Sequence, residues 1–299
     1  MSAMKSAEQP VSIKPARQFS TGRLVKWSIV ALLTFWAIIE LYPILFMFNA
    51  SLKTDPQILN NTFSLAFTPT FEGYKLVLEG NQSSQPFIVF FRNSVVILTG
   101  TITLLLVTSS LAGYALARGR FPGSPLVQQG FLLSLAVPAH TLLIPLYFFL
   151  GDLGLRDNLM GITLVYTTLG LPLSIVLARS YFLSFPVELE EQALIDGCTR
   201  SGAFLRIVIP MSTSVLATIA IVNVTWVWSE LFFAQAFLAD MDSRTLPIAV
   251  ASYQPARMAA SSTINQHFAI MTLTSLPLII FYFLFQKNIR KGMTAGALK

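Results

Sequence analysis

Long uncharged stretches alternate with short charged segments along the whole chain. Six stretches are nearly free of charge and long enough to cross a bilayer, which takes about 20 apolar residues per helix. They span residues 27–50, 93–117, 127–150, 158–178, 212–237 and 268–285. Pro138, Pro145 and Pro172 lie inside two of them, and membrane helices tolerate proline when neighbouring groups satisfy the freed carbonyls. The pattern predicts an all-α integral membrane protein with six transmembrane helices.

Composition agrees with this pattern. Hydrophobic residues make up 54% of the chain and charged residues only 11%, whereas a soluble domain carries about 25% charged residues. A soluble enzyme or a nucleic-acid-binding protein is therefore excluded as a class. The single cysteine, Cys198, cannot form an intramolecular disulfide, and it leaves no cysteine cluster for a metal.

The basic residues set the predicted orientation. Of the 20 Lys and Arg residues, fourteen fall in the N-terminal tail, the second and fourth connections and the C-terminal tail, and six fall on the other side. Positive charge accumulates on the cytoplasmic side, so both termini are expected there. We expect residues 1–23 to form a disordered cytoplasmic tail, residues 24–290 a transmembrane domain and residues 291–299 a cytoplasmic C-terminal tail.

The cytoplasmic segment 183–210 is unusual in this chain because it is charged. It contains EEQALIDGCTRSGAFLRIVIP, which ends at Pro210. Pro186 suits the first turn of a helix, and Gly197 suits its end because glycine adopts the left-handed cap conformation. Three acids occupy the first turns, where the helix dipole favours negative charge: Glu188, Glu190 and Glu191. A second helix is expected from Ser201 onward.

This segment resembles the cytoplasmic EAA loop of binding-protein-dependent ABC importer permeases. The family pattern Glu-Ala-Ala-x3-Gly-x9-Ile-x-Leu-Pro is matched here by Glu191, Gln192, Ala193, Gly197, Ile207, Ile209 and Pro210. Gln192 and Ile209 depart from the pattern without breaking the helix or the turn. LAGYALARGRFPG, TWVWSELFFA and the ending QKNIRKGMTAGALK are also similar to family segments, and the resemblance covers the chain from about residue 51 to its end.

The resemblance implies a specific assembly. The chain would be the second permease of a maltose-type carbohydrate importer in the bacterial cytoplasmic (inner) membrane. Its partners would be two copies of an ABC ATPase, a second homologous permease and an extracytoplasmic solute-binding protein. The residues expected to couple to the ATPase are Glu190, Glu191, Ala193, Asp196, Gly197, Ile207 and Pro210. The alternative for this segment is a solvated loop that has no partner.

The chain has no phosphate-binding G-x-x-x-x-G-K-[ST] loop. It is therefore expected to be a transport subunit rather than an enzyme, with no catalytic residues, no metal and no cofactor of its own. ATP and Mg would be bound by the partner ATPase.

Polar and aromatic residues inside the expected spans are candidates for the substrate path: Glu40, His140, Asn223, Trp226, Trp228 and Glu230. Each has an alternative. Glu40 either lines a cavity or pairs with a neighbour, and Asn223 either joins helices or lines a cavity. Trp226, Trp228 and Glu230 either contact sugar or pack at the membrane interface. His140 either lines the path or packs with a satisfied hydrogen bond.

Two other classes compete with the ABC permease. A gradient-driven secondary transporter would use Glu40 and His140, but it has no need of Glu191 and Gly197 at their spacing. A membrane enzyme would need clustered acids or a Ser/His/Asp set near one membrane face, and the sequence offers neither. The substrate stays open among oligosaccharides, disaccharides, polyols and glycerol phosphate.

Replacement of Glu40 by glutamine tests its assignment to the path. An ionised carboxylate is costly inside a membrane unless it faces protein or water, so its removal should change substrate handling more than assembly. We expect Glu40→Gln to alter uptake rate or selectivity while the variant still assembles, measured by sugar uptake and by co-purification of its partners. Loss of the complex with unchanged selectivity in the surviving molecules would contradict the assignment.

Overall fold

The computed structural model describes residues 21–80, 85–119, 121–253 and 263–297 of the chain. The described residues form helices and connections and contain no strand. The chain divides into two compact units, Met1–Phe46 and Met47–Lys299, each described here by itself. The single domain expected over residues 24–290 is thus divided near the end of its first helix. Most of the expected N-terminal tail lies outside the described residues, and its last three residues begin α1.

Most of helix α1 (Thr21–Ala50) belongs to the first unit. It spans 30 residues and includes Pro43, and at 1.5 Å per residue it is long enough to cross a bilayer. Its apolar side chains are exposed from residue 25 to residue 45, Trp27 and Phe35 among them. A helix that is apolar all round is suited to lipid or to a protein partner rather than to water.

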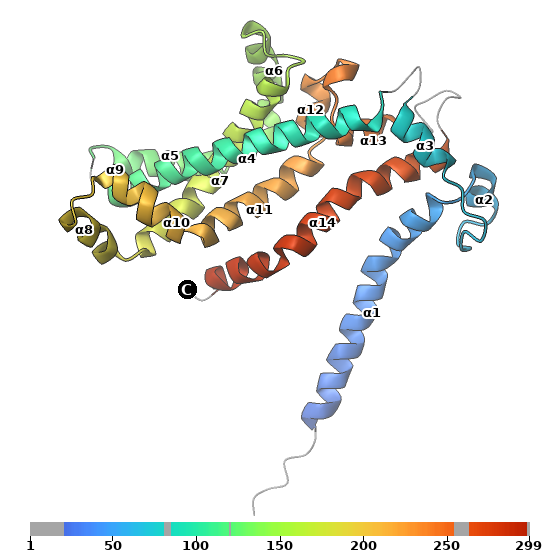
Figure 1. The fold of residues 1–299 in the computed structure, drawn as a ribbon, viewed down its shortest axis with the longest axis horizontal. Coiled ribbons are helices and arrows are strands. Elements are labelled where there is room, and N and C mark those ends of the chain that lie inside the picture. Colours follow the sequence, from blue (N-terminus) through green and yellow to red (C-terminus); the bar gives the residue numbers. More distant parts are fainter. Residues whose placement is uncertain (1–20, 81–84, 120, 254–262, 298–299) are drawn as a thin grey trace, which may run out of the picture. The chain divides into compact units, whose positions relative to one another are not determined.

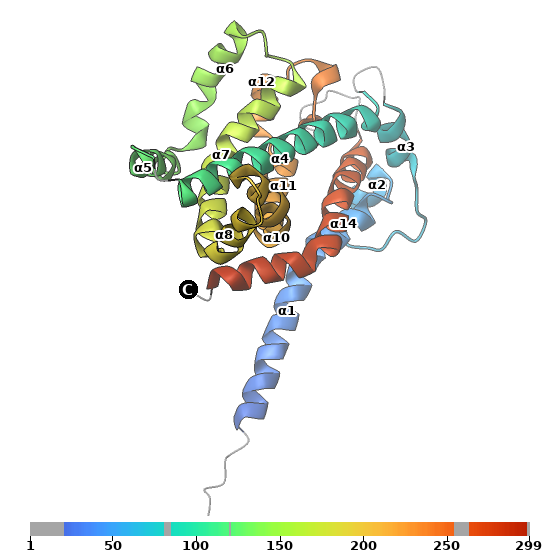
Figure 2. The same ribbon diagram turned by 60° about the vertical axis from the view of Figure 1, so that its left-hand side comes forward.

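The second unit is a bundle of long helices with short helices at both ends. Its helices are α2 (Asp55–Asn60), α3 (Glu72–Glu79), α4 (Phe87–Arg118), α5 (Ser124–Ser134), η1 (Ala139–Leu142), α6 (Leu143–Asp152), α7 (Leu159–Ser184), α8 (Val187–Ile195), α9 (Arg200–Ala203), η2 (Phe204–Val208), α10 (Ile209–Met211), α11 (Thr213–Ser229), α12 (Phe232–Phe237), η3 (Met241–Ser243), α13 (Leu246–Ser252) and α14 (Ile264–Ala297). Helix α4 packs along α7, and α11 packs against α4, α7 and α14. The short helices α8 and α9 lie at one end, and α3, α12 and α13 lie at the other (Figures 1 and 2).

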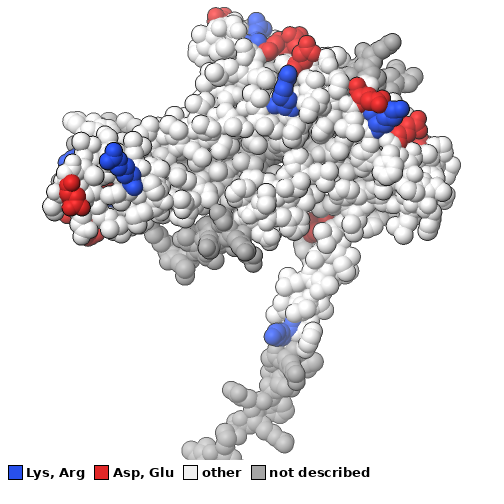
Figure 3. Space-filling view, viewed as in Figure 1, with Lys and Arg blue, Asp and Glu red and all other residues white. Residues whose placement is uncertain are grey.

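Four described helices are long and apolar enough to cross a membrane: Val25–Ala50, Phe87–Arg118, Leu159–Ser184 and Ile264–Gln286. Two bent helix pairs, Ser124–Ser134 with Ala139–Asp152 and Arg200–Met211 with Thr213–Ser229, raise the number to six if each pair is one span. On the face of the second unit drawn in Figure 3, charged side chains gather at the two ends and leave an uncharged band between them. Such a band is what the hydrocarbon core of a bilayer requires.

The stretch expected as the third span is broken. Helix α5 ends at Ser134 and α6 begins at Leu143, and the two helical parts meet at 96°. Pro138 stands at the break in an extended conformation. A proline lacks the N–H that would continue the helix and disfavours helical backbone at the residue before it, which explains the break. By contrast, Pro172 lies inside α7 without ending it.

Two other boundaries differ from the expectation. The stretch 212–237 divides where α11 ends at Ser229, because Glu230 takes an extended backbone and α12 begins two residues later. Helix α14 continues through most of the expected C-terminal tail to Ala297. The last two residues, 298 and 299, lie outside the described part of the chain.

Small residues allow α4 and α7 to approach closely. A methyl group added at Gly113 of α4 would lie 2.7 Å from the Cβ of Ala178 and 2.9 Å from the backbone nitrogen of Arg179. One added at Gly170 of α7 would lie 3.0 Å from the Cδ1 of Leu105 on α4. Membrane helices gain little from hydrophobic burial against each other, so close packing of this kind holds them together.

Gly113→Ala tests this contact. Its methyl group would collide with α7 backbone, so we expect a loss of about 1–3 kcal/mol of stability from overpacking, measured as a lower unfolding temperature in detergent. Gly130 of α5 is the matched control, because a methyl group there would meet nothing within 4 Å. Gly130→Ala should leave stability unchanged or raise it by about 0.5–1 kcal/mol through helix propensity. Equal effects of the two changes would exclude the proposed close approach.

Candidate functional site: the α8–α9 loop and the opposite aromatic cluster

Local sequence signals build the α8–α9 loop as they were expected to. Helix α8 begins after Pro186 and ends at Ile195, with Asp196 as its C-cap, and Gly197 follows with a φ of +87°. This confirms the predicted role of Gly197, since a left-handed φ favours glycine. The second short helix begins at Arg200, one residue earlier than expected. The side chain of Thr199 caps it by accepting a hydrogen bond from the backbone N–H of Gly202 at 3.1 Å.

Glu190 fastens the loop to the end of α4. Its side chain is buried, and its carboxylate accepts from Arg118 Nε at 2.9 Å and from the Tyr114 hydroxyl at 2.7 Å. Arg118 also donates to the backbone carbonyl of Phe185 at 2.6 Å, just before α8. Charge-assisted hydrogen bonds are stronger than neutral ones. Glu190 therefore holds the loop from inside rather than presenting its carboxylate to a partner.

Aromatic packing supports the same side of the loop. The Tyr114 ring lies 5.7 Å from the ring of Phe182 and 4.6 Å from that of Phe204. Ala193 of α8 is buried as well. The loop therefore rests on a core made by α4, α7 and the turn after α9.

The outer side of the α8–α9 loop is exposed at the surface of the second unit. Among the expected coupling residues, Glu191, Asp196 and Gly197 are exposed. Beside them, 84% of Ile195 is exposed, so the outer side of the loop also carries apolar surface. Sequence reasoning missed Ile195 because its helical position alone did not reveal which face α8 turns inward.

Ile207 and Pro210 belong to the return path rather than to the tip of the loop. Ile207 lies half-buried in the wide π-helical turn η2. Pro210 lies exposed in α10, just before the chain bends by 70° into α11. Proline suits such a position because the backbone N–H groups in the first turn of a helix have no partner within the helix, and proline has no N–H to leave unpaired.

At the opposite end of the unit, Glu230 acts as a cap. Its carboxylate accepts hydrogen bonds from the backbone N–H of Phe233 at 3.0 Å and of Ala234 at 3.1 Å, which begin α12. It also accepts a short hydrogen bond from the hydroxyl of buried Tyr166 on α7. These three donors fix the end of α11, the start of α12 and the middle of α7 together.

Rings surround this cap. Trp226 lies edge-on to Tyr166 at 5.4 Å between ring centroids. The exposed ring of His140, at the break between α5 and α6, lies 4.7 Å from Phe232 and 5.9 Å from Phe233. The structure thus brings His140, Trp226 and Glu230 into one chain of contacts, which we call the aromatic cluster. Its members are His140, Tyr166, Trp226, Glu230, Phe232 and Phe233.

The remaining path candidates lie elsewhere. Asn223 is buried and donates to Ser174 Oγ on α7 at 3.1 Å, so it joins two helices. Trp228 is buried, donates its indole N–H to the Thr274 carbonyl on α14 at 3.2 Å and packs edge-on to Phe91. Glu40 is exposed on α1 in the first unit. Within the described residues, neither Glu40 nor His140 has a recorded ion pair or hydrogen bond.

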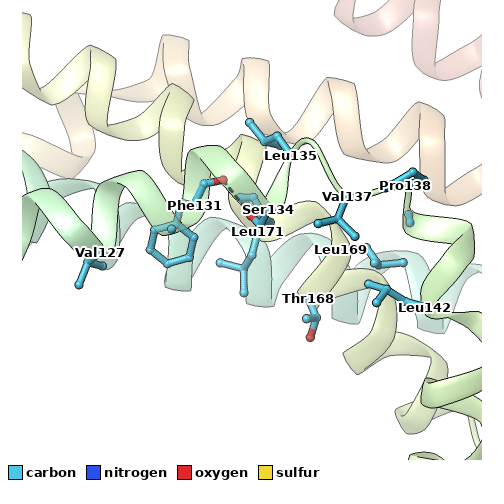
Figure 4. A pocket seen from close by; sticks show the side chains of 13 residues that line it. Val127, Phe131, Ser134, Leu135, Val137, Pro138, Leu142, Thr168, Leu169 and Leu171 are labelled. Atoms are coloured by element: carbon cyan, nitrogen blue, oxygen red, sulfur yellow. Dashed lines mark hydrogen bonds between the residues drawn. The ribbon is translucent and has the colours of Figure 1, made fainter.

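A groove lies beside the break between α5 and α6, next to His140. It measures about 760 Å³ and is bounded by α5, the break after it and α7, with Phe131, Pro138 and Thr168 among its walls (Figure 4). Its lining is mostly apolar. The described residues hold no group of three or more His, Cys, Asp or Glu side chains that could bind a metal ion.

The described part of the chain is thus a helical bundle with a fixed, partly exposed loop at one end. The sequence matches the family described as the inner membrane component of binding-protein-dependent transport systems over residues 106–295. The chain belongs to this family of ABC importer permeases, which confirms the resemblance read from the loop.

Relatives match nearly the whole chain. The trehalose/maltose transport system permease protein of Thermococcus litoralis is 33% identical over 88% of this chain and 93% of its own length. The trehalose transport system permease protein of Mycobacterium tuberculosis is 31% identical, over 89% and 97%. A solved bacterial ABC transporter that imports the acidic polysaccharide alginate has a chain with the same fold, with a TM-score of 0.80, 24% identity and coverage of 90% and 97%.

Glu190→Gln tests the internal fastening. The change keeps the shape of the side chain but weakens the bond to Arg118, so about 1–3 kcal/mol of local stability should be lost. We expect faster amide hydrogen exchange in α8, measured by mass spectrometry. The substitution Glu191→Gln at the neighbouring position is the control. Because Glu191 is exposed, this substitution should leave amide hydrogen exchange in α8 unchanged. Equal exchange in the two variants would show that Glu190 does not hold the loop.

Proposed function

We propose that this chain is one of two permease subunits of an ATP-driven sugar importer in the bacterial cytoplasmic membrane. It would cross the membrane six times, with both termini and the α8–α9 loop on the cytoplasmic side. The sugar assignment is supported by the relatives, whose names state transport of trehalose and maltose and of diacetylchitobiose. The orientation is supported by the excess of Lys and Arg on one side of the chain.

The observation that carries the proposal is the two-sided construction of the α8–α9 loop. One side is fixed to α4 through Glu190, and the other presents Glu191, Ile195 and Gly197 at the surface. A merely solvated loop has no need of a buried ion pair behind it. We infer that the exposed side docks on an ABC ATPase, present in two copies, which binds ATP and Mg.

In this proposal, movement of the ATPase is transmitted to the bundle. A displacement of α8 passes through Glu190 to Arg118 and Tyr114 of α4. The helices that would respond are α4 and α7, which pack closely on each other.

The aromatic cluster is our candidate for part of the sugar path. Aromatic faces suit the C–H surfaces of sugars, and Trp226 and His140 keep exposed ring surface there. Glu230 already accepts from three donors, so we assign it to shaping the cluster rather than to binding hydroxyls. Glu40 on α1 remains a separate candidate. A second permease would complete the path, and a solute-binding protein would deliver sugar to the outer face.

Cys198 allows a direct test, because it is the only cysteine and lies partly exposed in the loop. A membrane-impermeant maleimide should label it in inverted membrane vesicles that have been washed free of the ATPase, but not in right-side-out vesicles. Purification of the tagged chain in mild detergent should bring down an ATPase that blocks this labelling, together with a second permease. Labelling from the outside, or a chain that purifies alone even in the gentlest detergent, would overturn the proposal.

Gly197→Trp is expected to abolish uptake while the protein still folds. A Cβ at this position would have no atom within 4 Å, so the added side chain starts from open space and should obstruct a docked partner. Gly123→Trp is the matched control, because Gly123 has a similar φ of +85° and equally open surroundings outside the loop. Both changes carry a similar backbone strain of about 1–2 kcal/mol. Full uptake by Gly197→Trp, measured with radiolabelled sugar in cells, would exclude docking at this turn.

A further inference from the structure

A second, smaller pocket lies between α4, α5 and α7, near the end of the bundle that carries α8. It measures about 220 Å³. Leu116 of α4 and Leu183 of α7, which line it, stand within one turn of the ends of their helices. Six of its nine lining residues are Leu, Ile, Val or Phe, and the other three are Gln128, Arg179 and Ser180. The pocket therefore combines apolar walls with one cation and contains no acid.

Arg179 lacks a partner for its charge. Its Nε is buried without a hydrogen bond, and no ion pair or hydrogen bond to its side chain is recorded in the described part of the chain. Guanidinium groups stay charged in proteins, and an unsatisfied buried donor is destabilising. The buried acid at this end, Glu190, is already bonded to Arg118 and Tyr114. The pocket thus offers an anion-binding group that no residue of the described part of the chain neutralises.

The apolar walls around Arg179 indicate which kind of anion the pocket would bind. A phosphate monoester or diester pairs well with the planar fork of an arginine. A small free anion would make no use of the apolar walls, whereas a lipid would place its phosphate on Arg179 and its chains against apolar surface. Leu132 and Leu133 of α5 supply such surface, with 45% and 70% of their area exposed. Basic pockets between membrane helices on the cytoplasmic side bind anionic headgroups in this way.

We propose that this pocket binds the phosphate of an anionic phospholipid, with Arg179 as its charged contact and Gln128 and Ser180 as additional hydrogen-bonding groups. The assignment to the cytoplasmic leaflet rests on the orientation proposed above. The site lies on the last turns of α7, directly before the loop, so its occupant would brace the helix that leads into α8.

The test is lipid binding to the complete transporter in detergent, followed by native mass spectrometry during titration with dioleoylphosphatidylglycerol. We expect binding about tenfold tighter than that of zwitterionic dioleoylphosphatidylcholine, as for one charge-assisted contact. Arg179→Gln should abolish the preference, and Arg179→Lys should keep most of it. Arg206→Gln is the matched control, because Arg206 is an exposed arginine of η2 that does not line the pocket. This variant should bind like the wild type.

Four results would overturn the proposal. Two concern the preference for the anionic lipid: equal binding of the two lipids by the wild type, or an undiminished preference in Arg179→Gln. The other two concern the occupant of the pocket: displacement of the lipid by millimolar inorganic phosphate, or photo-crosslinking from position 128 to a partner permease in place of lipid. Binding is measured without ATP or sugar, so it does not depend on uptake. If Cys198 were labelled from outside while the Arg179-dependent preference persisted, the orientation would have failed and the lipid site would stand.

Discussion

The close approach of α4 and α7 is the constraint on which the rest of the second unit depends. Gly113 lets the two backbones meet at Ala178 and Arg179, and Asn223 then joins α11 to α7. In a membrane, close contacts of this kind hold helices together in place of the hydrophobic effect, which packs the helices of soluble proteins. Because α4 and α7 end at the same level, Arg118 lies within reach of both Phe185 and Glu190. The geometry of the α8–α9 loop is therefore a consequence of helix packing inside the bundle.

The two ends of the bundle are built by different interactions. The loop end is fixed by an ion pair between Arg118 and Glu190, whereas the opposite end is fixed by a carboxylate that caps a helix and by the rings around it. Trp226 and His140 leave ring surface accessible there, and Ile195 does so at the loop end. Each end thus combines a rigid internal support with a small exposed surface, and the proposed function would use these surfaces to bind partners on the two sides of the membrane.

The sequence predicted the class of fold and the turn at Gly197, because both follow from local properties: long uncharged runs and a residue that tolerates positive φ. It did not separate Glu190 from its neighbour Glu191. Their difference is decided by Tyr114 and Arg118, more than 70 positions away in the chain, and no local pattern reports such a contact. The helix end at Ser229 was missed for a similar reason, since Glu230 is held extended by donors from α7 and α12.

Arg118 joins three elements at one guanidinium group: its own helix α4, the carbonyl of Phe185 that ends α7, and Glu190 of α8. These contacts restrict the movement of α8 relative to α4 and to the end of α7. In the proposed coupling, a displacement of α8 would reach α4 and the end of α7 together through this one side chain. How far a movement of the partner ATPase displaces the membrane helices would then depend on how strongly Arg118 binds Phe185 and Glu190.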